Sequence, residues 1–344
     1  MNKPKVILDS GAYTAFKKGI TIDLDKYAQY VIEHGNEYAG CFNLDSIGDA
    51  EKSYANWKYL KDAGAETIPV YHIGTPEKWL QKYLKQTDYI GLGAIANLDT
   101  VQRLHSLGRI WKEYLIDAKG FPKYKIHGLG LTAIPIMLRY PWYSLDSFTP
   151  VISAVWGSIL LPSMVSGEPE YLGLKICKVS DQGDHKKGVV GSFTNLPEIL
   201  KERYMKLFQE HNFKLGEITY QERRARRGKK EEHDARLMPL FDLTKPASSE
   251  EKTMANDWEE RMRFNLTMWT HLRERLPIYP RAFEDNEPTY KEEVNTHKKT
   301  IMFMGVSTST HLKIFGKVHP KLDILISYAY LTNNIDDEIK IYVK

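Results

Sequence analysis

"AGCFNLDSIGDAEKSYANWKYLKDAGAETIPVYH", residues 39–72, contains the alternation that decides the fold. A β-favouring run over 39–45 leads into an amphipathic helical stretch over 51–64, and a second β-favouring run follows at 67–72. A strand, a helix and a second strand in this order are typical of two parallel strands joined by a crossover helix. The sequence therefore predicts a parallel sheet in this part of the chain.

The same alternation extends on both sides of this unit. Six strand–helix units in one run favour an α/β fold of the (β/α)8 TIM-barrel type over a shorter open sheet. Residues 153–161 are a candidate for a seventh strand, and apolar runs within 301–331 either close the barrel or form an appendage. The further strands are expected at 5–9, 89–93, 125–130 and 142–147, and the further helices at 24–35, 75–85 and 98–115.

The alternation ends after residue 160, where a charged stretch without an apolar face follows at 221–236. We therefore expect a TIM-barrel domain over residues 1–276 that carries a charged insertion around 165–248. A C-terminal extension is expected over residues 277–344.

The composition narrows the class of protein. The 344 residues carry 48 Lys and Arg against 44 Asp and Glu, and this net charge of +4 permits a nucleic-acid partner without requiring one. The two cysteines, Cys41 and Cys177, are too few for a disulfide framework or a cysteine-rich zinc site. Because no apolar run reaches about 18 residues and the chain enters a strand at once, we expect a cytoplasmic protein without a membrane span or a signal peptide.

Polar residues and glycines collect at the carboxyl ends of the predicted strands, where a barrel carries its active site. Any one Asp-Ser pair can simply cap the next helix, and a lone histidine is more often structural than catalytic. Three Asp-Ser pairs and two histidines at one rim favour an active site instead. The residues at this rim are Asp9, Ser10, Gly11, Asp45, Ser46, His72, Gly91, Gly93, His127, Gly128, Asp146 and Ser147.

Two carboxylates at such a rim can act together on a sugar carbon. One attacks C1′ to give a covalent glycosyl intermediate while the other transfers protons, as in retaining glycosidases. A third carboxylate can accept hydrogen bonds from N–H donors on the edge of a base. Tyr13, just beyond the first Asp-Ser pair, can stack on a flat ring.

These segments resemble the motifs of the tRNA-guanine transglycosylases. "LDSGAY" (8–13) resembles the Asp-Ser-Gly-Gly-Tyr/Phe motif of that family, and the resemblance continues in the family's order over about residues 5–160. His72 stands where the family has a glutamine, and a neutral imidazole offers one donor where an amide offers two. The further matching segments are "CFNLDS", "PVYHIGTPEKWL", "GLGAIA", "HGLGLTAI" and "YSLDS", with a weaker match at 263–276.

The resemblance implies roles for most of these rim residues. Asp146 would be the nucleophile at C1′, and Asp9 the general acid and base for the departing and entering bases. Asp45 would accept hydrogen bonds from N1–H and the 2-amino group of guanine. The remaining base-binding residues implied by the resemblance are Ser10, Tyr13, His72, Gly93, Ala94, His127 and Gly128, with Tyr13 and His127 on the two faces of the ring and Gly93, Ala94 and His72 near O6.

Two departures from the family pattern matter for cofactor and substrate. The family binds zinc through three cysteines and a histidine that precedes an Asn-Leu pair, whereas here Phe264 precedes Asn265-Leu266. We therefore expect no zinc, no other metal and no cofactor. The short chain also lacks the archaeal RNA-binding domain, and in this it resembles the phage and genomic-island DNA-guanine transglycosylases. These replace guanine in DNA with a 7-deazaguanine such as preQ0, which protects the DNA from restriction, so the expected compartment is the host cytoplasm if a phage encodes the chain.

A nucleic-acid partner requires a backbone-binding surface. A base inside a duplex must be flipped out or offered on a single strand, and phosphate contacts would supply the affinity. The densest basic run can equally be a solvated loop balanced by nearby acids, and the sequence is also compatible with a homodimer or a partner protein. The run consists of Arg223, Arg224, Arg226, Arg227, Lys229 and Lys230.

Three rival interpretations remain open at this point. The first is the same chemistry on tRNA. The second is a non-catalytic nucleic-acid-binding subunit, although such subunits lose the nucleophile and this chain keeps aspartates at both catalytic positions. The third is an unrelated barrel hydrolase with His72, His127 and Asp146 as metal ligands.

Overall fold

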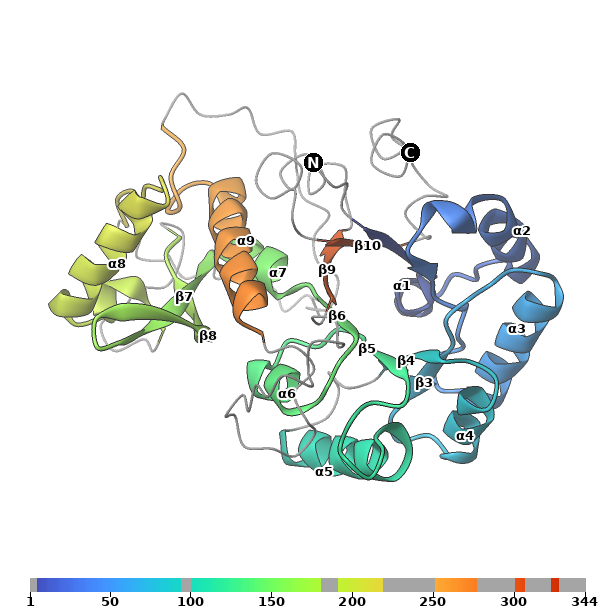
Figure 1. Ribbon diagram of the computed structural model, residues 1–344. Coiled ribbons are helices and arrows are strands. Elements are labelled where there is room, and N and C mark those ends of the chain that lie inside the picture. The colour runs from blue at the N-terminus through green and yellow to red at the C-terminus, as the bar shows by residue number, and fades with distance from the viewer. Residues whose placement is uncertain are drawn as a thin grey trace, which may run out of the picture.

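The computed structural model describes residues 5–93, 100–180, 191–218, 251–276, 301–306 and 323–327 (Figure 1). It shows a mixed α/β fold with an eight-stranded parallel sheet and a separate two-stranded antiparallel hairpin. The predicted α/β class and the parallel sheet are confirmed. No described helix is long and apolar enough to cross a membrane.

The eight strands of the sheet are hydrogen-bonded in the order β2-β1-β10-β9-β6-β5-β4-β3, and every pair is parallel. The six expected N-terminal strands are all present; β4 has the expected bounds, and the other five are shorter than their apolar runs. The strands are β1 (Val6–Asp9), β2 (Gly40–Cys41), β3 (Val70–His72), β4 (Tyr89–Gly93), β5 (Lys125–Gly128), β6 (Ser144–Ser147), β9 (Ile301–Val306) and β10 (Asp323–Ser327).

Hydrogen bonds also join the two ends of this strand order. Just after β2, Phe42 forms a parallel bridge with Ile68, which lies just before β3. The Ile68 amide donates to the Cys41 carbonyl at 2.7 Å, and the Asn43 amide donates to the Ile68 carbonyl at 2.9 Å. With this link, neighbouring strands follow one another in chain order from β1 to β6 and then through β9 and β10 back to β1.

The segment expected as a C-terminal extension contributes to this sheet. Strand β9 pairs with β6, and β10 pairs with both β9 and β1. The sheet therefore takes strands from both sides of the boundary expected at residue 277.

Helices connect the strands and lie in an arc around the outside of the sheet (Figure 1). Two begin at an aspartate that caps them, because the Asp23 carboxylate accepts from the Asp25 and Lys26 amides and the Asp49 carboxylate accepts from the Lys52 amide. The helices are α1 (Ala12–Lys18), α2 (Leu24–His34), α3 (Ala50–Asp62), α4 (Lys78–Leu84), α5 (Thr100–Ile110, followed by a π-helical turn at Trp111–Leu115) and α6 (Ile134–Arg139).

Both faces of the sheet are buried, in two separate hydrophobic clusters. The smaller cluster consists of Ile7, Phe42, Ile68, Val70 and Phe303, and we call its face of the sheet the inner face. The neighbour of Ile7 in β1, Leu8, belongs to the larger cluster that packs under the helices. Because side chains alternate along a strand, the residue after Leu8 returns to the inner face, and that residue is an aspartate.

The same alternation places polar residues of two other strands on the inner face. Ile126 and Leu145 belong to the larger cluster, so their neighbours His127 and Asp146 point the opposite way. The His127 ring accordingly lies 4.8 Å from the Phe42 ring, which is part of the smaller cluster. The pattern of the strands thus brings their polar residues together at one end of the inner face.

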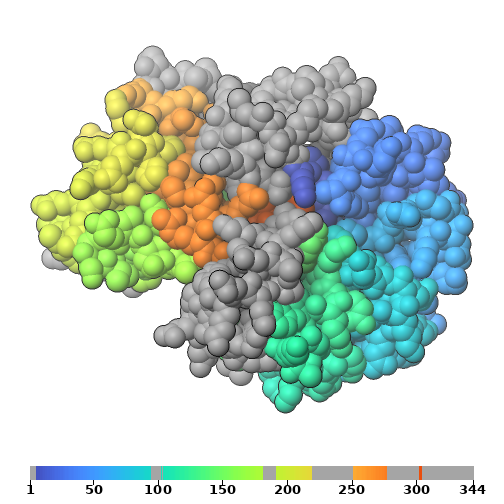
Figure 2. Space-filling model, viewed as in Figure 1, coloured from blue at the N-terminus to red at the C-terminus, as the bar shows by residue number. Residues whose placement is uncertain are grey.

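A second group of elements lies beside the sheet and its helices (Figure 2). Strands β7 (Ser158–Val165) and β8 (Glu168–Lys178) form an antiparallel hairpin, and α9 (Trp258–Arg275) packs against both strands and against α7 (Thr149–Val155). Helix α8 (Glu198–Glu210) completes the group. Residues 219–250, the charged part of the expected insertion, lie outside the described residues.

The candidate for a seventh strand at 153–161 is confirmed only over residues 158–161, which begin strand β7, and that strand pairs with β8 and not with the parallel sheet. Pro150 stands in the first turn of α7, where its ring fits, and Gly157 with φ 77° separates that helix from β7. The backbone of β7 pairs with β8 and is held from α9, since the Leu160 amide donates to Asn265 Oδ1 at 2.7 Å. The sheet strands that follow β6 come instead from residues 301–327.

Candidate active site

Three carboxylates gather at the carboxyl ends of the strands. Asp9 is the last residue of β1, Asp146 lies in β6, and Asp45 follows β2. Each was expected at this rim. The negative charges of Asp45 and Asp146 both raise the pKa of Asp9, so the three side chains share one electrostatic environment.

The pKa of Asp9 is raised from 3.8 to about 7. Burial of the carboxyl group is the largest cause, followed by the charges of Asp45 and then Asp146. Hydrogen bonds from the backbone of Gly11 and Ser10 oppose the shift without cancelling it. A group with a pKa near neutrality can both release and take up a proton at physiological pH, as a general acid and base must.

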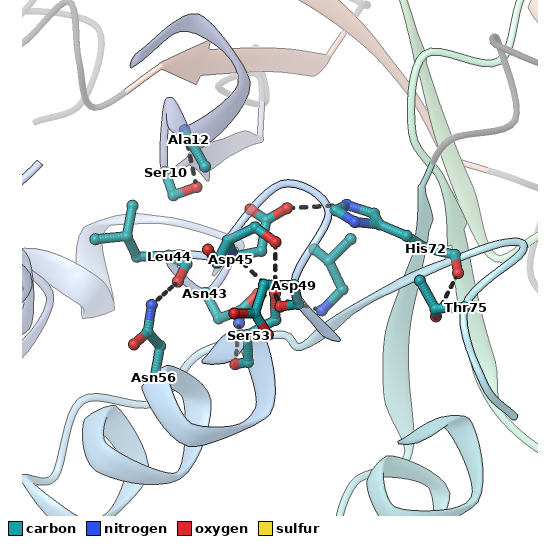
Figure 3. A network of polar contacts seen from close by, with 12 residues as sticks. Ser10, Ala12, Asn43, Leu44, Asp45, Asp49, Ser53, Asn56, His72 and Thr75 are labelled. Carbon is teal, nitrogen blue, oxygen red and sulfur yellow. Dashed lines mark hydrogen bonds and ion pairs between the residues drawn. The ribbon is translucent and has the colours of Figure 1, made fainter. Parts of the chain in front are cut away.

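The turn after Asp9 uses Ser10 and Gly11 structurally. Gly11 begins α1 in a left-handed conformation with φ 78°, which favours glycine. The buried Ser10 hydroxyl faces the start of α1, where the Ala12 amide lies 3.4 Å from Oγ (Figure 3). Tyr13, expected to stack on a base, lies in the first turn of α1 with 55% of its surface exposed and with Lys17 Nζ 5.3 Å from its ring centroid.

Asp146 is held through one of its two carboxylate oxygens. Its residue is 3% exposed, and Oδ1 accepts from the Gly130 amide at 2.9 Å and lies 3.1 Å from His127 Nε2. Within the described ranges, Oδ2 has no hydrogen-bond partner. This arrangement fixes the orientation of the carboxylate through Oδ1.

His127 does not fit the expected role of a stacking partner for the base. The residue is completely buried, its ring lies 4.8 Å from the Phe42 ring and 6.0 Å from the Phe303 ring, and its Nδ1 is 2.7 Å from Ser144 Oγ. No ring face is left for a ligand, because the strand alternation turns His127 into the inner face of the sheet. Its contact with Asp146 Oδ1 ties it to the proposed nucleophile instead.

Asp45 and His72 form a second pair of a carboxylate and a histidine in the site. Figure 3 shows the two side chains pointing toward each other, and His72 Nε2 lies 2.9 Å from Asp45 Oδ2. Their side chains remain 18% and 10% exposed for His72 and Asp45, so both can be reached by a small ligand. His72 was expected to contact O6 of guanine, and it would have to do so while its Nε2 lies beside Asp45.

Two asparagines that sequence reasoning did not select hold the loop that carries Asp45 (Figure 3). The fully buried Asn43 accepts from the Val70 amide and donates to the Ser53 carbonyl, and Asn56 donates to the Leu44 carbonyl at 2.8 Å. The signal available in the sequence was an amide inside an otherwise apolar strand end, "CFNLD". A buried amide of this kind is usually fully hydrogen-bonded and positions its neighbours.

Gly93 and Gly128, which were expected to bind the base, both lie where neighbouring side chains leave little room for a Cβ. A Cβ at Gly93 would lie 2.5 Å from His72 Cδ2 and 3.0 Å from His72 Nε2, so the absence of a side chain makes room for the imidazole. A Cβ at Gly128 would lie 3.2 Å from both Leu131 and Trp142, on the face away from the carboxylates. Ala94 and the basic run at 223–230 lie outside the described residues.

Gly93→Ala should weaken base binding through His72. The new methyl group would push the imidazole away from Asp45, and we expect a loss of about tenfold in guanine affinity, within the range for one hydrogen bond to a charged group. Isothermal titration with guanine would measure it for Gly93→Ala, His72→Ala and the double variant. Because the glycine is expected to act only through the histidine, the double variant should bind no worse than His72→Ala; fully additive losses would contradict this explanation.

Among the described residues, no group of three or more His, Cys, Asp and Glu side chains is arranged to hold a metal ion. The three residues of the hydrolase interpretation are divided between two pairs, since His72 contacts Asp45 and His127 contacts Asp146. The histidine nitrogens are therefore directed at carboxylates and not at a common point.

Comparison with known proteins adds no relative. No family model, no curated protein and no solved structure matches the chain.

Proposed function

We propose that this chain is a guanine transglycosylase, a pentosyltransferase that replaces guanine in DNA with a 7-deazaguanine of the preQ0 type and so protects DNA of phage type from restriction. The observation that carries the proposal is the grouping of three carboxylates in three different environments. Asp146 is buried with one oxygen that no described residue binds, Asp9 has a pKa of about 7, and Asp45 is partly exposed beside His72. A base exchange needs a nucleophile, a proton carrier and a base-edge acceptor, and these environments suit the three roles.

In the first step, Asp146 Oδ2 attacks C1′ of the deoxyribose and the C1′–N9 bond breaks. The electron pair of that bond leaves with guanine, and protonated Asp9 supplies the proton that makes the departing base neutral. A covalent aspartyl–glycosyl intermediate results. Its oxygen comes from the side of Asp146 that no described residue binds.

In the second step, the 7-deazaguanine enters and loses its N9 proton to the Asp9 carboxylate. N9 attacks C1′, the ester bond to Asp146 breaks, and both aspartates return to their starting states. Because Asp9 releases one proton and takes up another in each cycle, a pKa of about 7 suits both halves of the exchange. The Asp45 carboxylate accepts from N1–H and the 2-amino group of either base, which guanine and 7-deazaguanine share.

We also propose that the eight parallel strands form a closed (β/α)8 barrel in a cytoplasmic protein. The hydrogen bonds between Ile68 and the chain on both sides of Phe42 support closure. The continuous chain order of neighbouring strands supports it as well. The site then lies where barrels of this class carry their catalytic residues, at the carboxyl ends of the strands.

Base exchange with purified protein tests the function. Labelled guanine or preQ0 is offered with duplex DNA, single-stranded DNA and tRNA in parallel, and Asp146→Ala serves as the inactive control. We expect label to enter DNA, not tRNA, and to be absent with the variant. Label in tRNA alone would keep the mechanism and replace the substrate, while no label in any nucleic acid would count against an enzyme that acts without a partner.

DNA affinity should depend on the basic run. Replacing Arg223, Arg224, Arg226, Arg227, Lys229 and Lys230 with glutamine should weaken binding to all DNA sequences alike. The slope of log K against log salt should become shallower by about 0.9 for each phosphate that the protein no longer neutralises. Fluorescence anisotropy between low and moderate salt measures it, and an unchanged slope would show that the run is a solvated loop.

A further inference from the structure

A chain of hydrogen bonds runs through the interior of the sheet to Asp146. Tyr89 OH lies 2.7 Å from Ser144 Oγ, Ser144 Oγ lies 2.7 Å from His127 Nδ1, and His127 Nε2 lies 3.1 Å from Asp146 Oδ1. Three neighbouring strands supply these residues: Tyr89 begins β4, His127 lies in β5, and Ser144 and Asp146 lie in β6. The sequence pointed to His127 and Asp146 as site residues but did not predict that they would be hydrogen-bonded to each other, or linked to Ser144 and Tyr89.

The direction of the hydrogen bonds follows from the chemistry of the groups. An ionised carboxylate only accepts, so His127 Nε2 must carry a proton and donate to Asp146. In a neutral imidazole the other nitrogen is then an acceptor, and Ser144 uses its single O–H to donate to Nδ1. Ser144 Oγ is left to accept from the Tyr89 hydroxyl. One tautomer of His127 therefore satisfies every link.

The buried surroundings make this series of hydrogen bonds rigid. His127 and Ser144 are completely buried, and the imidazole lies 4.8 Å from the Phe42 ring and 6.0 Å from the Phe303 ring. Hydrogen bonds that are shielded from water in this way are stronger, and an unpaired partner among them is costly. The His127 ring cannot turn over without breaking both of its hydrogen bonds.

We propose that His127 is a positioning residue that, held as its Nε2–H tautomer by Ser144 and Tyr89, fixes Asp146 Oδ1 and thereby directs Oδ2 at the sugar carbon. The proposal rests on the role of Asp146 in the function given above. The Gly130 amide provides the second fixed donor on the same oxygen at 2.9 Å. Two donors on one oxygen leave the carboxylate a single orientation.

Two amide substitutions at His127 separate positioning from filling space. A glutamine amide nitrogen can take the place of Nε2 and still donate to Asp146, whereas an asparagine amide reaches only the place of Nδ1, near Ser144. We expect His127→Asn to lower kcat for base exchange about 10- to 100-fold, the range found when groups that orient a reacting ligand are removed. His127→Gln should recover most of that loss, and the KM for DNA should stay unchanged in both because the ring touches no substrate.

His34→Asn provides the matched control, because this histidine on α2 is exposed and pairs with Glu37. It should keep the activity of the unchanged protein. Equal kcat for His127→Asn and the unchanged protein would overturn the proposal, and so would equal losses in the Asn and Gln variants that both retain the fold.

The histidine tautomer gives a second readout that needs no enzymatic activity. Long-range ¹⁵N–¹H spectra of the histidine-labelled protein distinguish Nε2–H, Nδ1–H and imidazolium, and loss of one signal in His127→Gln assigns the residue. We expect Nε2–H for His127; either other form would overturn the proposal. If the unchanged protein exchanges no base, the proposed function fails. The tautomer of His127 still decides whether its Nε2–H donates a hydrogen bond to Asp146.

Discussion

Asp146→Asn is expected to lower the rate of base exchange by at least about 10³-fold, the scale of loss when a covalent nucleophile is removed. The amide has nearly the same shape as the carboxylate, and its Oδ1 can keep both hydrogen bonds, from the Gly130 amide and from His127. What the substitution removes is the negative charge on the oxygen that attacks C1′. The loss should therefore appear in kcat, while the fold and the binding of DNA persist.

Trapping the covalent intermediate makes this prediction specific. With DNA present and no free base, the unchanged protein should accumulate an adduct that survives denaturation and migrates as protein bound to DNA. Asp146→Asn should form none. Asp62→Asn is the matched control, because that carboxylate is exposed and, among the described residues, pairs only with Lys58 on the surface of α3. An adduct with Asp146→Asn, or exchange within tenfold of the unchanged protein, would assign the nucleophile to another group.

The strands and the carboxylates could be predicted from sequence because they depend on short-range patterns. A β-favouring run followed by Asp-Ser marks a strand and its carboxyl end, and this located Asp9, Asp45 and Asp146 correctly at one rim. The parallel arrangement followed from the alternation of strands and helices. These features need no knowledge of which strands are neighbours.

Features that depend on neighbouring strands were not predictable in this way. His127 and Ser144 lie 17 residues apart and meet only because β5 and β6 pair in a particular register. The family resemblance implied base stacking for His127, whereas the register buries its ring against Asp146. The placement of β9 and β10 beside β6 and β1 likewise depends on pairing between segments more than 150 residues apart, such as Asp146 with Phe303.

The helix after β6 illustrates how a local signal was outweighed. Residues 153–161 contain several β-favouring side chains, yet their first part ends α7 and their second part begins β7. Asn265 in α9 binds the backbone at both ends of this connection, accepting from the Leu160 amide and donating to the Pro150 and Ser158 carbonyls. A contact over about a hundred residues thus decides the local structure, and no pattern within the segment reveals it.

Asp9→Asn is expected to stabilise the protein at pH 8 and to abolish base exchange. In the folded protein the pKa of Asp9 is about 7, while its ordinary value is 3.8. Between these values the folded protein keeps a proton that the unfolded chain releases, so the free energy of unfolding falls as the pH rises through this window and stays low above pH 7. The stability is fully present only below the ordinary value of the unfolded chain.

The size of the effect follows from the shift. At about 1.36 kcal/mol per pKa unit, the titration of Asp9 removes about 2–3 kcal/mol of stability between pH 5 and pH 8. Asparagine does not titrate and can still accept from the Ser10 and Gly11 backbone. Urea unfolding at the two pH values should therefore show a smaller difference for Asp9→Asn than for the unchanged protein, by this amount. Identical pH dependence in the two proteins would mean that the Asp9 carboxyl is not perturbed.

The same titration should control the rate. The first step of exchange needs protonated Asp9 to make the departing guanine neutral, so kcat/KM for DNA should fall as the pH rises above about 7. Of the two neighbouring charges, Asp45 raises the pKa of Asp9 more than Asp146 does. Asp45→Asn should therefore move the pH at which kcat/KM falls to a lower value, and by more than removal of the Asp146 charge would. Because burial is the main cause of the shift, the pKa should stay above 3.8 even then. The Asp9 carboxyl group is expected to destabilise the fold at neutral pH, and its titration is expected to limit the reaction. Both properties fit a residue that serves proton transfer and not stability.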